Sequence, residues 1–236
     1  MKLTCTGDHR TTTIESDQPL RCLSWAPFAP NGPITHPVHT LVNATLGSDE
    51  FVDMDHLDSY CLERLRSQGL DPTKTVMLLT AVPQTQLQHE TVRVPATGLQ
   101  VDVFCTAGMG NAIAPGDPAL YDEELAVPVR RPGTINLIVI VNRCLTDQAL
   151  LELVHVATMA KCQALFELAQ KSSMSDRIAL GTGTDCIAIA GLAHADTSLR
   201  FGGLGTRLGS ITAQAVSQTL TRAIQNQRTH LLAQSH

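Results

Sequence analysis

The chain of 236 residues carries 17 Lys and Arg against 22 Asp and Glu, which gives a formal net charge of −5 at pH 7. This acidic balance, without any block rich in Lys or Arg, argues against nucleic-acid binding and against binding to an anionic membrane surface. Hydrophobic residues make up 43% of the chain and aromatic residues only 3%, so we expect a sizeable core that is mostly aliphatic.

The start of the chain and its cysteines indicate the compartment. The opening MKLTCTGDHR lacks the apolar segment of a secretory signal, and no apolar run reaches transmembrane length. The 7 cysteines are odd in number and form no C-x-x-C pair, which favours buried, reduced thiols over a structural zinc site. We therefore expect a cytoplasmic protein without a membrane partner.

The division of the chain follows its composition. Residues 1–19 are polar and rich in Thr, and we expect a loose N-terminal segment there. Residues 20–226 contain no internal repeat, flexible linker or break in composition, so they predict a single domain. Residues 227–236 read as a polar tail with frayed structure.

Strands and helices alternate along this domain, although imperfectly. Apolar or β-branched runs predict strands at 20–25, 38–46, 75–81, 91–94, 100–106, 133–142 and 186–190, and helical periodicity predicts helices at 55–68, 146–170 and 206–225. The extra strand pairs suit a mixed sheet better than a purely parallel one. The predicted fold class is α/β, a single layered domain with a mixed, mostly buried central sheet flanked by helices.

Two histidines near the start resemble a pair of metal ligands. His36 and His39 flank Pro37 and Val38. Pro37 prevents a helix, and in a strand residues three apart face opposite ways, so surface histidines are the simpler interpretation.

The glycine-rich stretch from Gly181 to Asp185 combines backbone freedom with polar side chains. Gly181 and Gly183 alternate with Thr182 and Thr184, and Asp185 leads into the apolar run 186–190. Glycines let the backbone approach a ligand, whereas hydroxyls and a carboxylate supply chemistry. The alternative is a tight turn whose threonines and Asp185 satisfy their own backbone.

A second glycine-rich turn follows the strand at 100–106. It runs over residues 107–112 and ends on the amide of Asn111. The long loop at 113–132 that comes next is a candidate lid. Arg130 and Arg131 at its end either meet an anionic group or lie solvated on the surface.

Two polar residues fall on surfaces that should be buried. Asn136 lies within the most apolar strand, where it is either a structural clamp or a substrate donor, because a buried amide needs partners. Lys161 completes the inward stripe of the helix at 146–170. It either snorkels to solvent, pairs with a carboxylate such as Asp185, or contacts substrate.

Taken together, the chain resembles the adenosylcobinamide amidohydrolases of corrinoid salvage over roughly residues 20–225. Five segments in order carry the resemblance: LSWAPFAPNG and HTLVN within 23–43, MLLTA at 77–81, TAGMGNA at 106–112, GTINLIVIVNRCLTDQAL with ATMAK within 133–161, and GTGTDCIAIA at 181–190, with GLGTRLG behind it. The chain departs from the family where Pro33 replaces a second glycine after Asn31-Gly32 and where Cys162 replaces a threonine. The first twenty residues show no counterpart.

The resemblance implies hydrolysis of the amide that joins the aminopropanol arm to the corrin ring of adenosylcobinamide. The products would be adenosylcobyric acid and 1-amino-2-propanol, and the role would be cobamide salvage and remodelling. It implies a small-molecule corrinoid substrate, no metal and no cofactor, since the cobalt belongs to the substrate. Homo-oligomer formation is left open.

The chain has no G-x-S-x-G or H-E-x-x-H motif, so we place the chemistry at the mouths of the apolar strands. Asp185 would act as a base toward water or toward Thr184 as nucleophile, and Lys161 would tune that group or donate a proton. Asn111 and Asn136 would hold the scissile carbonyl. The full predicted substrate-binding set is Asn31, Asn43, Thr106, Asn111, Asn136, Gly181, Thr182 and Gly183.

Two rival functions remain. A corrinoid- or nucleotide-binding protein without activity would use the same glycine-rich turns only to hold a ligand. A metal-dependent amidase would use His36 and His39, and would lose activity in chelator.

Overall fold

The computed structural model describes residues 1–47, 56–122, 127–128 and 133–234. The described part of the chain contains three α-helices, and most of its strands join one sheet. The helices are α1 (Leu57–Ser67), α2 (Asp147–Glu167) and α3 (Arg207–Gln234). The strands of the large sheet are β1 (Leu3–Gly7), β2 (Thr11–Ser24), β3 (Ile34–Thr45), β4 (Thr75–Thr80), β5 (Gln88–Val94), β6 (Leu99–Ala107), β10 (Ile135–Leu145), β12 (Cys186–Leu192) and β13 (Ser198–Leu199).

The sheet is mixed, as predicted. Its order is β4-β3-β2-β12-β10-β6-β5, and β1 pairs with β2 while β13 pairs with β10. The pairs β3/β4, β10/β12 and β10/β13 are parallel, and the remaining pairs are antiparallel. Small two-stranded pairs join β7 (Ala112–Ile113) to β11 (Gly181–Thr182) and β8 (Tyr121–Asp122) to β9 (Val127–Pro128).

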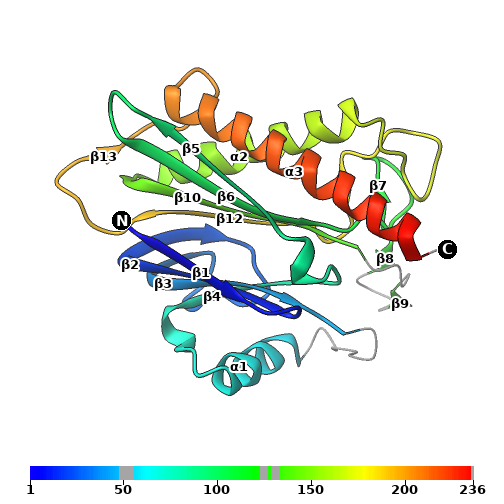
Figure 1. The fold of residues 1–236 in the computed structure, drawn as a ribbon, viewed down its shortest axis with the longest axis horizontal. Coiled ribbons are helices and arrows are strands. Elements are labelled where there is room, and N and C mark those ends of the chain that lie inside the picture. The colour runs from blue at the N-terminus through cyan, green and yellow to red at the C-terminus, as the bar shows by residue number, and fades with distance from the viewer. Residues whose placement is uncertain (48–55, 123–126, 129–132, 235–236) are drawn as a thin grey trace.

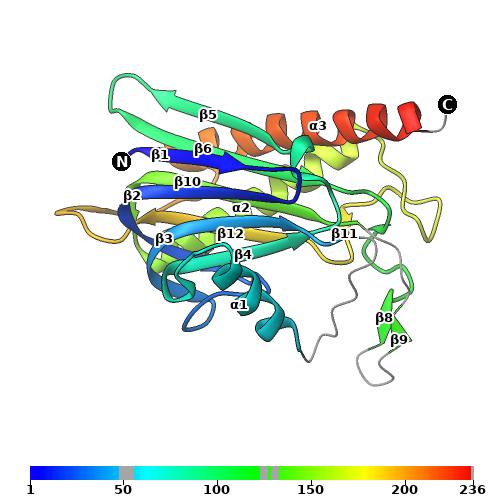
Figure 2. The same ribbon diagram turned by 60° about the horizontal axis from the view of Figure 1, so that its bottom comes forward.

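Helices cover the sheet on two opposite sides (Figure 1). One apolar cluster packs α2 and α3 against β6, β10 and β12, and another packs α1 against β3 and β4. Figure 2 shows α1 lying across the N-terminal strands, on the side away from α2 and α3. Burial of these aliphatic faces is the main stabilising term, at about 1.5–3 kcal/mol for each fully buried Leu or Ile side chain.

A third cluster lies between the two halves of the sheet. It joins Leu41 of β3 and Val76 of β4 to Phe104 of β6 and Ile138 of β10. Since β3 and β10 are separated in the sheet order by β2 and β12, these contacts require the sheet to fold back on itself. The layers are therefore helix, half-sheet, half-sheet and helix, and strands from distant parts of the sequence face one another.

Strand β10 presents alternate side chains to two different apolar clusters. Ile135, Leu137, Val139 and Val141 of β10 contribute to the cluster with α2 and α3, whereas Ile138 and Ile140 contribute to the cluster between the half-sheets. The predicted strands and helices all occur, and most of their ends differ by a few residues, although β2 begins well before the predicted strand and α3 ends well after the predicted helix. Thr146 caps α2, because its side chain accepts a hydrogen bond from the backbone N–H of Ala149 at 3.2 Å.

The prediction of a loose N-terminal segment is wrong. Residues 3–7 form β1, and residues 11–19 are the first part of the long strand β2. The polar composition gave a wrong prediction because Thr, although polar, readily forms strands. Ile14 is the main apolar residue of this stretch that enters the core. The tail is also more ordered than predicted, since α3 continues to Gln234.

Helix α2 is long and apolar enough, by length and composition alone, to cross a membrane. Its mean hydropathy is 1.3 over an 18-residue window, and half of that window is buried inside the fold. Leu150, Leu153 and Ala157 pack in the cluster with the sheet and α3. The core helix of a folded domain has the same composition, and that is the position α2 occupies here.

Candidate active site

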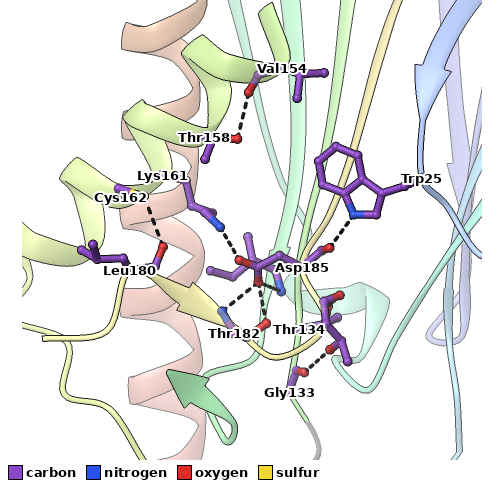
Figure 3. Close-up of polar contacts among 12 residues, drawn as sticks. Trp25, Gly133, Thr134, Val154, Thr158, Lys161, Cys162, Leu180, Thr182 and Asp185 are labelled. Atoms are coloured by element: carbon purple, nitrogen blue, oxygen red, sulfur yellow. Dashed lines mark hydrogen bonds and ion pairs between the residues drawn. The ribbon is translucent and has the colours of Figure 1, made fainter. Parts of the chain in front are cut away.

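The carboxylate of Asp185 lies at the centre of a polar cluster at the start of β12 (Figure 3). Its Oδ1 accepts hydrogen bonds from the backbone N–H of Thr182 at 3.1 Å and of Ile135 at 3.2 Å. The hydroxyl of Thr182 donates to the same oxygen at 2.5 Å. The carboxylate is therefore held by donors from its own turn and from the start of β10.

Lys161 of α2 forms an ion pair with the other carboxylate oxygen, Oδ2 of Asp185. The whole lysine residue is 8% exposed, and the two side chains are 10% and 11% exposed. Of the three interpretations of the inward lysine, pairing with Asp185 is confirmed. Such a pair loses hydration and needs the hydrogen bonds that Thr182 and Ile135 provide.

Gly181 leaves the space that this ion pair occupies. A Cβ atom on Gly181 would lie 2.6 Å from Oδ2 of Asp185 and 2.9 Å from Nζ of Lys161. Any larger residue would push the two charged groups aside. The glycine is required here by the close approach of a buried ion pair to the backbone.

The two glycine-rich turns meet at this cluster, as predicted. The backbone N–H of Gly183 donates to the carbonyl of Asn111 at 3.3 Å, and that of Gly108 donates to the carbonyl of Thr134 at 2.8 Å. The hydroxyl of Thr184 donates to the carbonyl of Gly133 at 2.8 Å. In return, the Thr134 hydroxyl donates to the carbonyl of Thr184 at 2.6 Å. The exposed tip at residues 183–184 thus lies directly beside the buried cluster.

Thr184 does not contact the Asp185 carboxylate, contrary to the predicted pair. Its hydroxyl is committed to Gly133, and the threonine that reaches the carboxylate is Thr182. A spacing of three residues lets both the backbone N–H and the hydroxyl of Thr182 turn toward Oδ1. The interpretation as a self-satisfying turn is thus confirmed for Thr182, which also belongs to the buried cluster.

Three more predicted site residues form a buried network between the half-sheets. The Asn136 amide donates to Oδ1 of Asn43 at 2.7 Å and to the carbonyl of Leu79 at 2.9 Å. The Asn43 amide donates to Oγ1 of Thr106 at 3.0 Å. All the side chains in this network are almost fully buried, Asn136 being 1% exposed.

This network changes the role open to Asn136. Both N–H bonds of its amide are used within the protein, so it has no donor left for a scissile carbonyl. Its Oδ1 has no hydrogen-bond partner among the described residues, and the same is true of Oδ1 of Asn111. The geometry therefore fits the structural clamp, and it leaves the predicted donor role of Asn136 without a free N–H.

Asn31 lies in the loop after β2, apart from this network. It is exposed, with a φ of 65°, and none of the hydrogen bonds found in the described ranges joins it to the Asp185 cluster. Arg130 and Arg131 lie outside the described residues, as does part of the loop at 113–132 that was expected to act as a lid.

Trp25, at the end of β2, is a site residue that sequence reasoning missed. Its indole N–H donates to the main-chain carbonyl of Asp185 at 2.8 Å (Figure 3). The residue is nevertheless 49% exposed. The available signal was that the only tryptophan of the chain lies inside a segment that carries the family resemblance.

Three buried cysteines, Cys22, Cys105 and Cys186, are poor candidates for a nucleophile. Burial raises the pKa of the thiols of Cys22 and Cys186 to about 12, and it also raises the pKa of Cys105. A thiol with such a pKa is protonated near neutral pH and is a poor nucleophile. Cys5 is exposed, but it belongs to β1.

The described side chains include no group of three His, Cys, Asp or Glu residues placed to hold a metal ion. His36 and His39 lie on β3, as the strand interpretation of that segment requires. The chemistry available at the Asp185 cluster is therefore that of a carboxylate, an ammonium group and hydroxyls.

Comparison with known proteins places the chain among hydrolases. A sequence profile described as adenosylcobinamide amidohydrolase matches residues 3–231, so the match includes the N-terminal residues for which no counterpart was expected. An adenosylcobinamide amidohydrolase of Halobacterium salinarum is 31% identical over 175 residues, which cover 72% of this chain and 68% of that protein. An uncharacterised protein of Methanocaldococcus jannaschii is 34% identical over 137 residues, covering 52% of this chain and 53% of that protein.

Two solved structures are similar in outline. A β-aminopeptidase of a Burkholderia species matches with a TM-score of 0.44 and 13% identity, covering 91% of this chain and 77% of that chain. A Pyrococcus horikoshii OT3 protein matches with a TM-score of 0.44 and 10% identity, covering 94% and 82%.

Proposed function

This chain belongs to the adenosylcobinamide amidohydrolase family, and we propose that it hydrolyses the amide between the aminopropanol arm and the corrin ring of adenosylcobinamide. The products are adenosylcobyric acid and 1-amino-2-propanol, and the reaction serves cobamide salvage and remodelling in the cytoplasm. The observation that supports this proposal is the buried cluster of Lys161, Asp185 and Thr182 beside an exposed glycine-rich tip.

Amide hydrolysis needs a nucleophile, a group that takes its proton and a group that gives a proton to the leaving amine. The cluster contains one residue for each task. Thr182 has a hydroxyl bonded to a carboxylate, Asp185 is that carboxylate, and Lys161 is the adjacent ammonium. Oδ1 of Asp185 already accepts three hydrogen bonds, and one of them comes from the Thr182 hydroxyl, so this hydroxyl, rather than that of Thr184, can pass its proton directly to the carboxylate. The geometry thus supports the hydroxyl of Thr182 as the nucleophile in place of Thr184.

The reaction proceeds in two stages, through an ester on Thr182. The Oγ1 atom of Thr182 bonds to the amide carbon while its proton passes to Asp185. The carbon–nitrogen bond then breaks, and Lys161 gives a proton to the departing nitrogen, which leaves as 1-amino-2-propanol. Asp185 passes its proton back to Lys161, restoring the ion pair. Water cleaves the ester on Thr182, releasing adenosylcobyric acid and returning the hydroxyl its proton.

The test is to incubate the purified protein with adenosylcobinamide in dim light, with and without chelator, and to assay both products by mass. We expect product in both conditions. Thr182→Val, which removes the hydroxyl at nearly constant volume, should lower kcat by at least about 10³-fold. The matched control Thr184→Val should retain activity within about tenfold, because its hydroxyl donates to the carbonyl of Gly133 and not to the Asp185 carboxylate.

Other outcomes would reject parts of the proposal. Intact substrate with folded protein would favour a binding protein without activity. Activity that disappears in chelator and returns with a divalent metal would favour a metal-dependent amidase. If Thr184→Val loses activity while Thr182→Val keeps normal activity, Thr184 and not Thr182 is the nucleophile.

A further inference from the structure

The indole of Trp25 is held in a fixed position at the edge of the Asp185 cluster. Its N–H donates to the carbonyl of Asp185, on the residue whose carboxylate binds Lys161 and Thr182. Figure 3 shows the indole lying on the opposite side of Asp185 from Lys161. One residue thus connects the buried charges to an aromatic ring at the surface.

The backbone beneath the ring is also fixed. Ser24 is buried, with 2% of the residue exposed. Its hydroxyl donates a hydrogen bond to the carbonyl of Ile187 at 3.0 Å and accepts one from the backbone N–H of Ala26 at 3.0 Å. The first bond joins the end of β2 to β12, and the second fixes the local turn that contains Trp25. A ring restrained in this way loses little conformational entropy when a ligand covers it.

The exposure of Trp25 is unusual for such a well-anchored side chain. Tryptophan is highly buried on average, yet this ring leaves 49% of the residue in contact with solvent. Phe201 has a similar exposure of 51%, but it lies beyond β13, and the Arg200 guanidinium stacks over it at 5.4 Å. Trp25 therefore presents an apolar aromatic surface within the immediate surroundings of the cluster.

We propose that Trp25 is the binding platform for the corrin macrocycle, an inference that rests on the proposed function. The scissile amide is at the end of a side chain on the rim of a broad, largely apolar ring. An enzyme that places this amide at Thr182 must hold the macrocycle beside the cluster, and a rigid indole offers offset stacking or edge contact. The carbonyl contact to Asp185 then fixes the distance between platform and reaction centre.

The platform is tested with adenosylcobyric acid, which carries the macrocycle but lacks the scissile amide. Its Kd is measured by equilibrium dialysis in dim light, read from corrin absorbance. We expect Trp25→Ala to raise Kd at least about tenfold, and Trp25→Phe, which keeps an aromatic face, to stay within about threefold. The matched control Phe201→Ala, with equal exposure away from the cluster, should bind as the wild type does.

A second measurement needs no variant. The chain has a single tryptophan, so corrinoid binding at Trp25 should quench intrinsic fluorescence with saturation at the same Kd, whereas 1-amino-2-propanol alone should leave it unchanged. Unaltered Kd in Trp25→Ala, or unquenched fluorescence at saturating adenosylcobyric acid, would overturn the platform.

The two proposals fail separately. If the wild type hydrolyses adenosylcobinamide and Trp25→Ala binds adenosylcobyric acid unchanged, the role of Trp25 is rejected and the proposed hydrolysis stands. If binding of adenosylcobyric acid depends on Trp25 but the wild type does not hydrolyse adenosylcobinamide, the proposed hydrolysis is rejected and the role of Trp25 in binding stands. If the wild type does not bind adenosylcobyric acid at all, the platform is rejected.

Discussion

Lys161 and Asp185, 24 residues apart in sequence, form a buried ion pair that joins α2 to the turn before β12. Removing one member of such a pair leaves an uncompensated charge, at a cost of about 3–5 kcal/mol. Asp185→Asn should therefore abolish turnover and also lower the free energy of unfolding, because the amide N–H₂ would face the ammonium of Lys161.

The double variant Lys161→Met/Asp185→Asn separates these effects. With both charges gone, the free energy of unfolding in urea should recover by about 2 kcal/mol or more relative to Asp185→Asn, since a buried pair can often be replaced without loss. Turnover should remain absent. Activity close to wild type in either variant would remove the ion pair from the mechanism.

Gly181→Ala tests the space beside the ion pair. The added Cβ would approach both Asp185 and Lys161 too closely, so we expect a loss of about 1–3 kcal/mol in the free energy of unfolding. Hydrolysis should fall with it, because the two charged groups are displaced. Gly205→Ala is the matched control, since a Cβ there meets nothing within 4 Å. Equal stability of the two variants would contradict the packing seen at Gly181.

Asn136→Leu tests the clamp between the half-sheets. The change leaves Oδ1 of Asn43 and the carbonyl of Leu79 without their donor, at about 1–3 kcal/mol for each buried group. We expect this loss in urea unfolding. Asn142→Leu on the same strand also removes two hydrogen bonds, from Gln100 and to Gly98, but at a partly exposed position where water can replace them, so it should cost clearly less. A catalytic defect of the folded Asn136→Leu protein without any stability loss would restore the role of substrate donor.

Asp102 predicts an acid-dependent stability term. Burial raises its pKa, but hydrogen bonds from His89, Thr91 and Gln100 together outweigh burial and leave the pKa below its ordinary value. A carboxyl with a lowered folded-state pKa stabilises the protein fully above the unfolded pKa, at about 3.9, and this contribution is lost as pH falls through the folded pKa.

The wild type should therefore exceed Asp102→Asn in free energy of unfolding at pH 6, and the difference should shrink as the pH falls below about 4. The exposed Asp196→Asn serves as control. A difference that stays constant across this range would show that Asp102 stabilises through packing and not through its charge.

The local sequence determined most of the elements. Period-two alternation in β10 and the capping residue Thr146 of α2 predicted their positions, because they depend on neighbours along the chain. The inward stripe of α2 predicted that Lys161 needs a partner, and the glycine-rich turn supplied Asp185. The polar composition of residues 11–19 led to the wrong prediction of a loose segment. These residues form a strand because they pair with β3, although few of them are apolar.

Only the tertiary structure decided which polar residues meet. The half-sheets pack against each other, which brings Asn43 of β3 next to Asn136 of β10. Both N–H groups of the Asn136 amide then donate within the protein, to Asn43 and to the carbonyl of Leu79. The structure shows that the Thr182 hydroxyl bonds the Asp185 carboxylate, whereas the Thr184 hydroxyl bonds Gly133. The sequence alone could not distinguish these two threonines, because both lie in the same turn. Trp25 joined the site through a main-chain carbonyl 160 residues away, and a backbone acceptor has no sequence signature.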